Sequence, residues 1–268
     1  RKVADEVKDP VTGGPRRVLV AGSMGPTVKS LSLSPDVNEP QRRDVSFEQM
    51  AQAYKVQVEA LVEGGVDMLL VETVYDALNA KAALYAISQV EKARDIPVMV
   101  SATVNDRSGR LLSGHTLDAL YTALQHYPII SFGLNCSFGA KDLVPFIEQL
   151  QGLPCAVSIY PNAGLPNEMG QYDESPEYTA KYIRELALKG WLNIAGGCCG
   201  TTPEHIAAIA KSLQGVAPRE FACECGDKMD GPDISDRGKN YREENMYLCG
   251  LESLRVNRKE CNFVNVGE

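Results

Sequence analysis

Residues 196–205 have the sequence GGCCGTTPEH, which places two adjacent cysteines in a glycine-rich segment. An apolar run at 191–195 leads into this segment, and a run with helical periodicity at 206–213 follows it. Glycine permits the sharp backbone turns and close approaches that such a connection needs. The sequence therefore predicts a strand, a turn that carries Cys198 and Cys199, and a helix.

A second cysteine segment lies upstream. Residues 129–140 read IISFGLNCSFGA, a predicted strand with Cys136 near its carboxyl end. Cysteines at the carboxyl ends of two parallel strands can converge on one point, and three protein ligands with one open position are typical of a catalytic zinc ion. Cys136, Cys198 and Cys199 therefore predict a zinc site that activates a thiol substrate. The alternative is a buried Cys136 beside a vicinal thiol pair that holds no metal.

The chain alternates between strand-like and helical patterns. Short apolar runs, typical of buried parallel strands, lie near residues 17, 68, 97, 129, 155 and 191. This alternation predicts an α/β fold with a parallel sheet. A (β/α)8 barrel would place the carboxyl ends of the strands on the active face. An open doubly wound sheet is the rival fold, but no Gly-x-Gly-x-x-Gly sequence follows the first predicted strand.

Composition narrows the classes of function. The chain has 268 residues, a net charge of -8 and eight cysteines. It has no basic cluster typical of nucleic-acid binding and no apolar run of the roughly 20 residues that span a membrane. The first residues lack the apolar region of a signal peptide. We therefore expect a cytoplasmic protein that binds neither nucleic acid nor membrane, in which clustered cysteines are metal ligands or catalytic groups.

Three motifs at the ends of predicted strands carry a family resemblance. They are GLNCS at 133–137, YPNAGLP at 160–166, and GGCCG at 196–200 with TPEHI at 202–206. Together they resemble the homocysteine-binding domain of cobalamin-dependent methionine synthase. Shorter similarities lie at 20–22, 25–27, 34–37, 72–73 and 79–83.

The resemblance implies a domain organisation. Residues 1–216 are expected to form a (β/α)8 TIM-type barrel that lacks its first one or two β/α units, because nothing matches the Asp-Gly-Ala-Met-Gly type motif near the start of family members. Residues 217–268 are expected to form a polar linker and a junction toward a folate-binding domain, since GLE at 250–252 and FVNVGE at 263–268 resemble that junction. A second metal site is the alternative for four further cysteines: Cys223, Cys225, Cys249 and Cys261.

The resemblance also implies an activity. Cys136, Cys198 and Cys199 would hold zinc, which takes up the homocysteine thiol, and methylcobalamin on another domain would supply the methyl group. The partners would be homocysteine and the folate- and cobalamin-binding domains of the same enzyme. One alternative is a cobalamin-independent homocysteine S-methyltransferase of the betaine type. Another is a catalytically inactive barrel fragment with a structural or interaction role.

Four residues are candidates for contacts with the substrate. Asp118 stands where family members carry a glutamate, so it is a candidate for the homocysteine ammonium, and its alternative role is that of a solvated helix residue. Glu72, at the end of a predicted strand, is a second candidate, with a hydrogen bond at the barrel rim as its alternative role. Asn135 and Asn162 are expected to fix the loops around the metal ligands.

Overall fold

Six parallel strands form one sheet, and each strand pairs with the next strand along the chain. The computed structural model describes residues 5–8, 14, 16, 18–221 and 245–257, with side chains in the last range only for 250–252. The strands of the sheet are β1 (Ala21–Met24), β2 (Met68–Val74), β3 (Val98–Ala102), β4 (Ile129–Gly139), β5 (Ala156–Asn162) and β6 (Ile194–Ala195).

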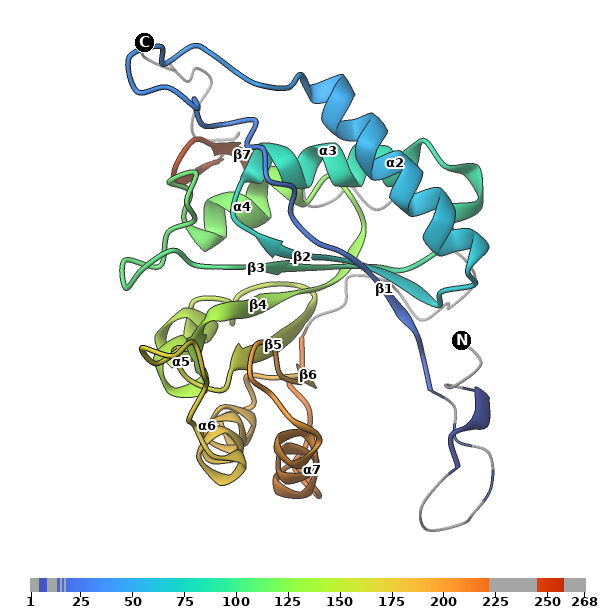
Figure 1. Ribbon diagram of the computed structural model, residues 1–268, viewed down its shortest axis with the longest axis vertical. Coiled ribbons are helices and arrows are strands. Elements are labelled where there is room, and N and C mark those ends of the chain that lie inside the picture. The colour runs from blue at the N-terminus through green and yellow to red at the C-terminus, as the bar shows by residue number, and fades with distance from the viewer. Residues whose placement is uncertain (1–4, 9–13, 15, 17, 222–244, 258–268) are drawn as a thin grey trace.

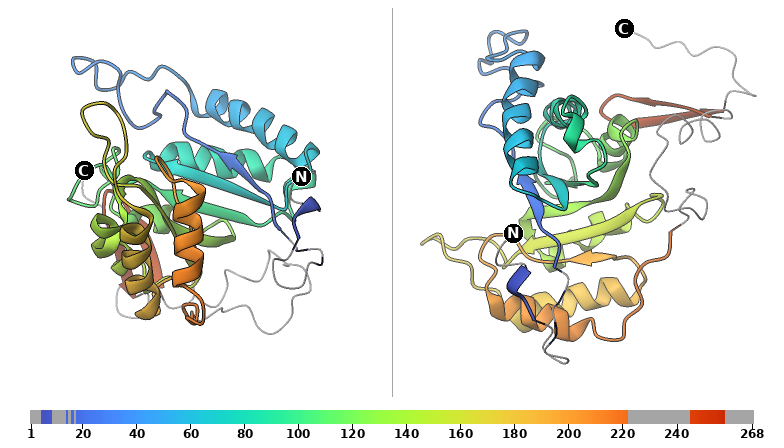
Figure 2. Two further views of the ribbon diagram at one scale, coloured as in Figure 1. Left: turned by 60° about the horizontal axis from the view of Figure 1, so that its bottom comes forward. Right: turned by 90° about the vertical axis from the view of Figure 1, so that its right-hand side faces the viewer.

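Helices connect the strands and lie outside the curved sheet. The helices that follow β1, β2 and β3 lie over the half of the sheet that these strands form, and the helices that follow β4, β5 and β6 lie against the other half (Figure 1). Figure 2 shows the same two groups of helices from other sides. The helices are α2 (Phe47–Glu63), α3 (Ala77–Ser88), the 3-10 turn η1 (Glu91–Ala93), α4 (Leu117–Leu124), α5 (Ala140–Glu148), α6 (Pro176–Leu188) and α7 (Pro203–Ser212).

The strand order decides between the two predicted folds. Because crossovers between parallel strands are right-handed, an unreversed order 1-2-3-4-5-6 places every helix on the same face, as in a barrel. A doubly wound sheet would reverse its order at a switch point. In the part of the chain that the structure describes, β1 and β6 are the two edges of the sheet. The fold is therefore α/β with six parallel strands, consistent with a partial TIM barrel.

The predicted elements are largely confirmed, with shifted ends. The first strand lies at 21–24 rather than near 17, because its four residues are the ones that pair with Met68–Val71 of β2. The helix α3 ends at Ser88, and the chain enters the 3-10 turn η1 three residues later. Ser46 and Gln49 form a capping box at the start of α2, an arrangement that a serine followed three residues later by a glutamine favours.

Burial follows the strand pattern. All five residues of β3 are buried, and the interior strand residues Phe132, Leu134 and Val157 have no exposed surface. Such strands are buried on both faces, as expected for a parallel sheet covered by helices. The core therefore runs through the middle of the sheet, and polar residues gather where the strands end.

Arg219 fastens the segment after α7 to the barrel. Its guanidinium donates to the carbonyl oxygens of Gln151 (2.7 Å), Leu153 (2.8 Å) and Cys155 (3.0 Å), just before β5. The side chain is buried, and the Arg219 backbone N–H donates to the carbonyl of Leu192. The region predicted as a linker from residue 217 thus begins with an anchored segment.

Beyond the linker, β7 (Asn245–Cys249) and β8 (Ser253–Asn257) form an antiparallel hairpin. The turn of this hairpin contacts the barrel: the Thr116 N–H donates to the Leu251 carbonyl, and Arg110 forms an ion pair with Glu252 at 2.5 Å. Residues 222–244 and 258–268, which hold most of the predicted linker and the FVNVGE motif, lie outside the described residues.

Asp76 organises the long loop between β1 and α2. Its fully buried carboxylate accepts hydrogen bonds from Ser30, from the Ser32 N–H (2.9 Å) and hydroxyl (2.6 Å), and from the Leu78 N–H (2.8 Å). Burial alone would raise the pKa of Asp76, but these hydrogen bonds outweigh burial, and the net pKa is lowered. A carboxylate at this N-cap is also favoured by the dipole of α3.

We expect Asp76→Asn to lower the free energy of unfolding at pH 7 by about 1–3 kcal/mol. The carboxylate accepts several hydrogen bonds, whereas the asparagine side chain would turn an N–H group toward partners that are themselves donors. A lowered folded-state pKa means that the wild-type advantage is present above the unfolded pKa of about 3.9 and is lost as the pH falls through the folded value. Urea unfolding of both proteins at several pH values measures this. A difference in stability that stays constant down to pH 2 would contradict the assignment.

Candidate metal centre

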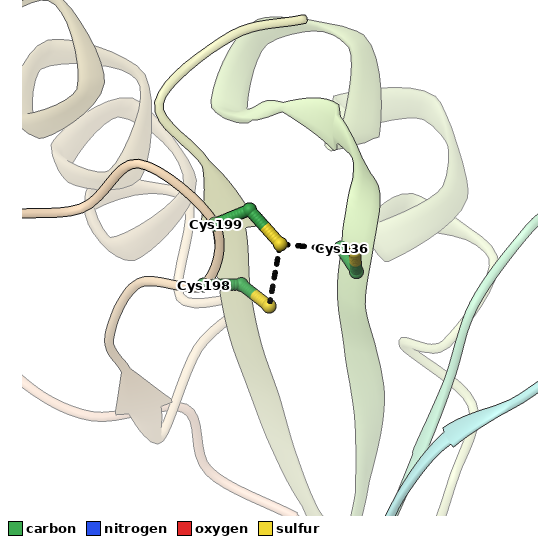
Figure 3. Close-up of side chains that lie close together, drawn as sticks. All are labelled: Cys136, Cys198 and Cys199. Carbon is green, nitrogen blue, oxygen red and sulfur yellow. Dashed lines mark hydrogen bonds between the residues drawn. The ribbon is translucent and has the colours of Figure 1, made fainter. Parts of the chain in front are cut away.

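Three cysteine sulfurs meet at the carboxyl ends of β4 and β6. The Cys136 Sγ lies 3.7 Å from the Cys199 Sγ, and the Cys198 Sγ lies 3.9 Å from the Cys199 Sγ. All three sulfurs are within 4.8 Å of one another, and each cysteine is partly buried. Figure 3 shows the three side chains converging from two separate segments of the chain. The structure thus brings together the three predicted ligands.

An unusual backbone conformation carries Cys136. Cys136 and Ser137 have φ values of 62° and 60°, and Thr73, at the end of β2, has φ 56°. Residues other than glycine rarely adopt this left-handed region, and such positions tend to cluster at functional sites. The register between β4 and β5 shifts between Asn135 and Gly139, where these residues turn. The bend separates Cys136 from the regular ladder.

The segment with Cys198 and Cys199 continues along the end of β5. The Cys198 N–H donates to the Pro161 carbonyl at 2.7 Å, and the Ala163 N–H donates to the Cys199 carbonyl at 2.9 Å. At the other end, Thr202 caps α7. These bonds hold the backbone of both cysteines, so the positions of their sulfurs do not depend on a flexible loop.

Asn135 connects the ends of three strands to the cysteines. Its buried Oδ1 accepts from the Thr73 N–H (3.0 Å) and the Ser101 hydroxyl (2.7 Å), and its Nδ2 donates to the Thr73 hydroxyl (2.8 Å). The same Nδ2 lies 3.9 Å from the Cys198 Sγ, within the range of a weak hydrogen bond to sulfur. Asn135 therefore stabilises the left-handed conformation of Thr73 and supports Cys198.

Asn162 acts on the other vicinal cysteine. Its buried side-chain oxygen accepts from the Cys199 N–H at 3.1 Å. Each of the two predicted asparagines thus contacts one ligand or its backbone. Partners of this kind orient metal ligands and are a regular part of metal sites in proteins.

The sulfur spacing fits zinc. Zinc binds thiolate sulfur at about 2.3 Å in a tetrahedral arrangement, which places ligand sulfurs roughly 3.8 Å apart. Burial, followed by the charges of Cys136 and Cys199, raises the pKa of Cys198 to about 12, although the Asn135 amide opposes the shift. Three thiolates side by side therefore need a positive partner. A divalent cation that prefers sulfur supplies one, and the donor set suits zinc.

The structure places the two acidic candidates differently. Glu72, at the end of β2, accepts a hydrogen bond from the Ser23 hydroxyl. Its charge also acts on Tyr160. The pKa of Tyr160 is raised mainly by burial, and the nearby charges of Glu72 and Cys198 raise it further. Asp118 is exposed in the first turn of α4. Glu72 thus shares a polar environment with Cys198, through Tyr160.

Sequence reasoning missed several residues around the cysteines. Thr73, Ser101, Tyr160 and Tyr172 lie near the cysteine segments. Thr73 and Tyr160 belong to segments that carry the family resemblance, at 72–73 and 160–166, but the sequence assigns them no role, and no motif marks Ser101 or Tyr172. A left-handed φ at a threonine has no signal in the sequence, and Tyr172 reaches the site from a loop whose path depends on tertiary packing. His205 completes the capping box of α7 with Thr202, and its Nε2 lies 2.9 Å from the Glu174 carbonyl oxygen, so the imidazole has a structural role.

The remaining cysteines have separate positions. Cys155 is buried in the core before β5, as its apolar neighbours indicate. Cys223, Cys225 and Cys261 lie outside the described residues, as does the side chain of Cys249, so the second metal site stays a prediction. Among the described residues, no helix is both long enough and apolar enough to cross a membrane.

Comparison with known proteins agrees with this geometry. The family model of homocysteine S-methyltransferase matches residues 1–213. The apo form of the homocysteine methyltransferase MmuM from Escherichia coli is 25% identical, with a TM-score of 0.56, and the match covers 76% of this chain and 65% of that one. For the metallated form of the same protein, the identity is 24%, the TM-score 0.57 and the coverage 75% and 63%.

The chain therefore spans less than two thirds of the length of these solved relatives. The family match extends over most of the barrel and includes all three cysteines of the cluster. On this match, the chain belongs to the homocysteine S-methyltransferase family.

Proposed function

We propose that this chain is the homocysteine-activating module of a cobalamin-dependent methionine synthase. The observation that carries the proposal is the spacing of the Cys136, Cys198 and Cys199 sulfurs, two pairs of which lie 3.7 and 3.9 Å apart. Cys136, Cys198 and Cys199 would hold zinc with a fourth position left open, and the metal would lower the pKa of a substrate thiol there and keep its sulfur nucleophilic at neutral pH. The methyl donor would be methylcobalamin.

The chain's own residues hold the cysteines ready for this step. Asn135 donates toward the Cys198 sulfur, and Asn162 accepts from the Cys199 backbone. Because both asparagines are buried and bonded, the ligands are held in place before substrate arrives. Little reorganisation is then needed when the thiol binds, which is how preorganised polar groups favour a reaction.

Glu72 is the proposed partner of the substrate ammonium group. It lies at the end of β2, on the same side of the sheet as the cysteines, and the Ser23 hydroxyl donates to its carboxylate. Asp118 is the alternative partner. It is exposed at the start of α4, so it would bind the ammonium group only if homocysteine extends from the cysteines to that helix. A charged hydrogen bond of this kind contributes about 1.5–3 kcal/mol.

We therefore expect Glu72→Gln to raise the KM for homocysteine about 10- to 100-fold while zinc content stays unchanged. Steady-state kinetics with metal analysis of the same samples measures both quantities. Asp118→Asn is the matched control, since it removes one carboxylate from the other candidate position. If Asp118→Asn carries the loss and Glu72→Gln does not, the two roles are exchanged.

The proposal that methylcobalamin is the methyl donor rests on the C-terminal segment of the chain. The GLE motif forms the turn between β7 and β8, and this turn contacts the β3–α4 loop through Thr116 and Arg110. A folate-binding domain that follows this junction, with a cobalamin-binding domain, would supply and reload the methyl group. The family also includes methyltransferases that need no cobalamin, so a betaine-type reaction is the competing function.

A donor assay separates these functions. Zinc-loaded protein is incubated with homocysteine and either methylcobalamin or betaine, and methionine is measured. We expect methionine only with methylcobalamin, together with proton release when homocysteine is added. Methionine from betaine would establish the cobalamin-independent alternative. A folded, zinc-loaded protein that makes no methionine from either donor would indicate an inactive barrel with a structural role.

A further inference from the structure

The side chain of Glu174 fills the space between the ends of two strands. It lies on the connection between β5 and α6, and its carboxylate packs against Gly139, the N-cap residue of α5. A Cβ added at Gly139 would be 2.6 Å from the Glu174 Oε1, and a Cβ added at Gly164 would be 2.8 Å from its Cγ. Gly139 has φ -72°, which any residue adopts, so the space that Glu174 occupies is what requires glycine there.

The backbone of Glu174 is fixed to the segment that carries Cys198 and Cys199. Its N–H donates to the Ala163 carbonyl at 3.1 Å, and the Ala163 N–H donates to the Cys199 carbonyl at 2.9 Å. The Glu174 carbonyl oxygen lies 2.9 Å from the Nε2 of His205, in the first turn of α7. Glu174 therefore cannot move away from the cysteine turn without the loss of these bonds.

The Cys136 segment leaves the regular ladder where it bends. Between Asn135 and Gly139 the register of β4 against β5 shifts, and pairing resumes where Gly139 faces Asn162. Cys136 lies within this interruption, in the left-handed conformation. Its position relative to β5 is therefore defined at the two ends of the bend, and Glu174 packs against the end at Gly139.

We propose that Glu174 is a positioning residue whose side chain holds the Cys136 bend at a fixed distance from the vicinal cysteine pair. Its carboxylate meets the Gly139 end of the bend, and its backbone is bonded toward Cys199 through Ala163. The inference rests on the proposed zinc site and goes beyond it, because it assigns a role to a residue of the β5–α6 connection. Partners that orient metal ligands typically contribute about 10- to 100-fold to metal affinity.

The contact depends on the shape of the Glu174 side chain. Within the part of the chain that the structure describes, its buried Oε2 has no hydrogen-bond partner. The side chain therefore acts on Gly139 by occupying space, and glutamine, which has the same shape, should replace it. Alanine would leave that space empty and allow the two cysteine segments to approach each other.

The test compares Glu174→Ala with Glu174→Gln. Glu168→Ala is the matched control, because this glutamate is exposed on the same connection. Each protein is loaded with Co²⁺ in place of zinc, and its absorption bands, which report the arrangement of the sulfur ligands, are recorded. Zinc affinity is measured by competition with a chelator, and melting curves confirm that each variant is folded.

We expect Glu174→Ala to shift the cobalt bands and to lower the zinc affinity about 10-fold. Glu174→Gln should stay close to wild type in both measurements, and Glu168→Ala should leave both unchanged. A Glu174→Ala protein that melts earlier but keeps the wild-type spectrum and zinc affinity would overturn the proposal, since the side chain would then only stabilise the fold. A Glu174→Gln protein as impaired as Glu174→Ala would overturn it as well.

A second pair of variants tests the contact from the other side, and it decides the question if Glu174→Ala does not fold. Gly139→Ala adds a methyl group where the Glu174 carboxylate lies, so it should also shift the bands and weaken zinc binding. Glu174→Asp shortens the side chain by one methylene group, so the double variant should recover part of the loss, as residues in contact do.

A double variant that binds zinc no better than Gly139→Ala alone would overturn the role of Glu174 and leave the zinc site standing. A folded wild-type protein that binds neither zinc nor cobalt would overturn both this inference and the proposed function.

Discussion

Cys198→Ala is expected to abolish stoichiometric zinc binding and, with it, all methyl transfer to homocysteine. The Cys198 sulfur lies 3.9 Å from the Cys199 sulfur, and its removal leaves two protein ligands where a catalytic zinc site needs three. The loss should exceed the 10- to 100-fold fall in affinity that follows the loss of a residue that only orients a ligand. Metal analysis of protein purified under reducing conditions measures the stoichiometry.

Cys155→Ala is the matched control for this prediction. Cys155 is buried in the core and does not belong to the cluster, so its replacement should cost some stability and leave the zinc content unchanged. The comparison separates a specific ligand from a general effect of losing a thiol. Equal zinc content in wild type and in Cys198→Ala would refute the assignment of the metal centre.

Gly133→Ala is expected to have the largest effect on stability. Gly133 pairs with Ser158 in the β4–β5 ladder, and a Cβ at Gly133 would lie 2.0 Å from the Ser158 carbonyl oxygen and 2.1 Å from its hydroxyl. Since the obstacle includes backbone in the middle of the sheet, side-chain rotation cannot relieve it. We expect a loss of at least about 4 kcal/mol in the free energy of unfolding, measured by urea denaturation.

Gly152→Ala provides the matched control in the loop before β5. An added Cβ at Gly152 meets nothing within 4 Å, and its φ is not in the left-handed region. The same chemical change should therefore alter stability by less than about 1 kcal/mol or even stabilise slightly. If Gly133→Ala and Gly152→Ala unfold at the same urea concentration as wild type, the tight β4–β5 contact is wrong.

The expected loss of zinc binding and the expected loss of stability both depend on the conformation of β4. Gly133 allows β4 to approach β5 closely, and three residues later the same strand turns through the left-handed conformation of Cys136. Asn135, between them, is bonded to β2 and β3 through Thr73 and Ser101. Damage to the β4–β5 contact should therefore also displace Cys136, so Gly133→Ala is expected to lose zinc as well as stability.

The local elements were predictable because their signals are local. The capping box at Ser46 and Gln49 and the strand that carries Cys136 near its carboxyl end follow from patterns within a few residues. The first strand was misplaced because Ala21–Met24 contains glycine and serine and does not look like a strand. Its pairing with β2 outweighs the weak local preference, as tertiary contacts often do.

The sequence by itself determined the α/β alternation and the identity of the three cysteines, because strand periodicity and a vicinal cysteine pair are properties of short segments. Only the tertiary structure decided the unreversed strand order, the left-handed Thr73 and the approach of Tyr172. These features bring together residues that are far apart in the chain. The Asn135 Nδ2 and the Cys198 Sγ, for example, lie 3.9 Å apart. Contacts of that kind depend on how the strands pair and how the loops pack, and no local pattern of residues encodes them.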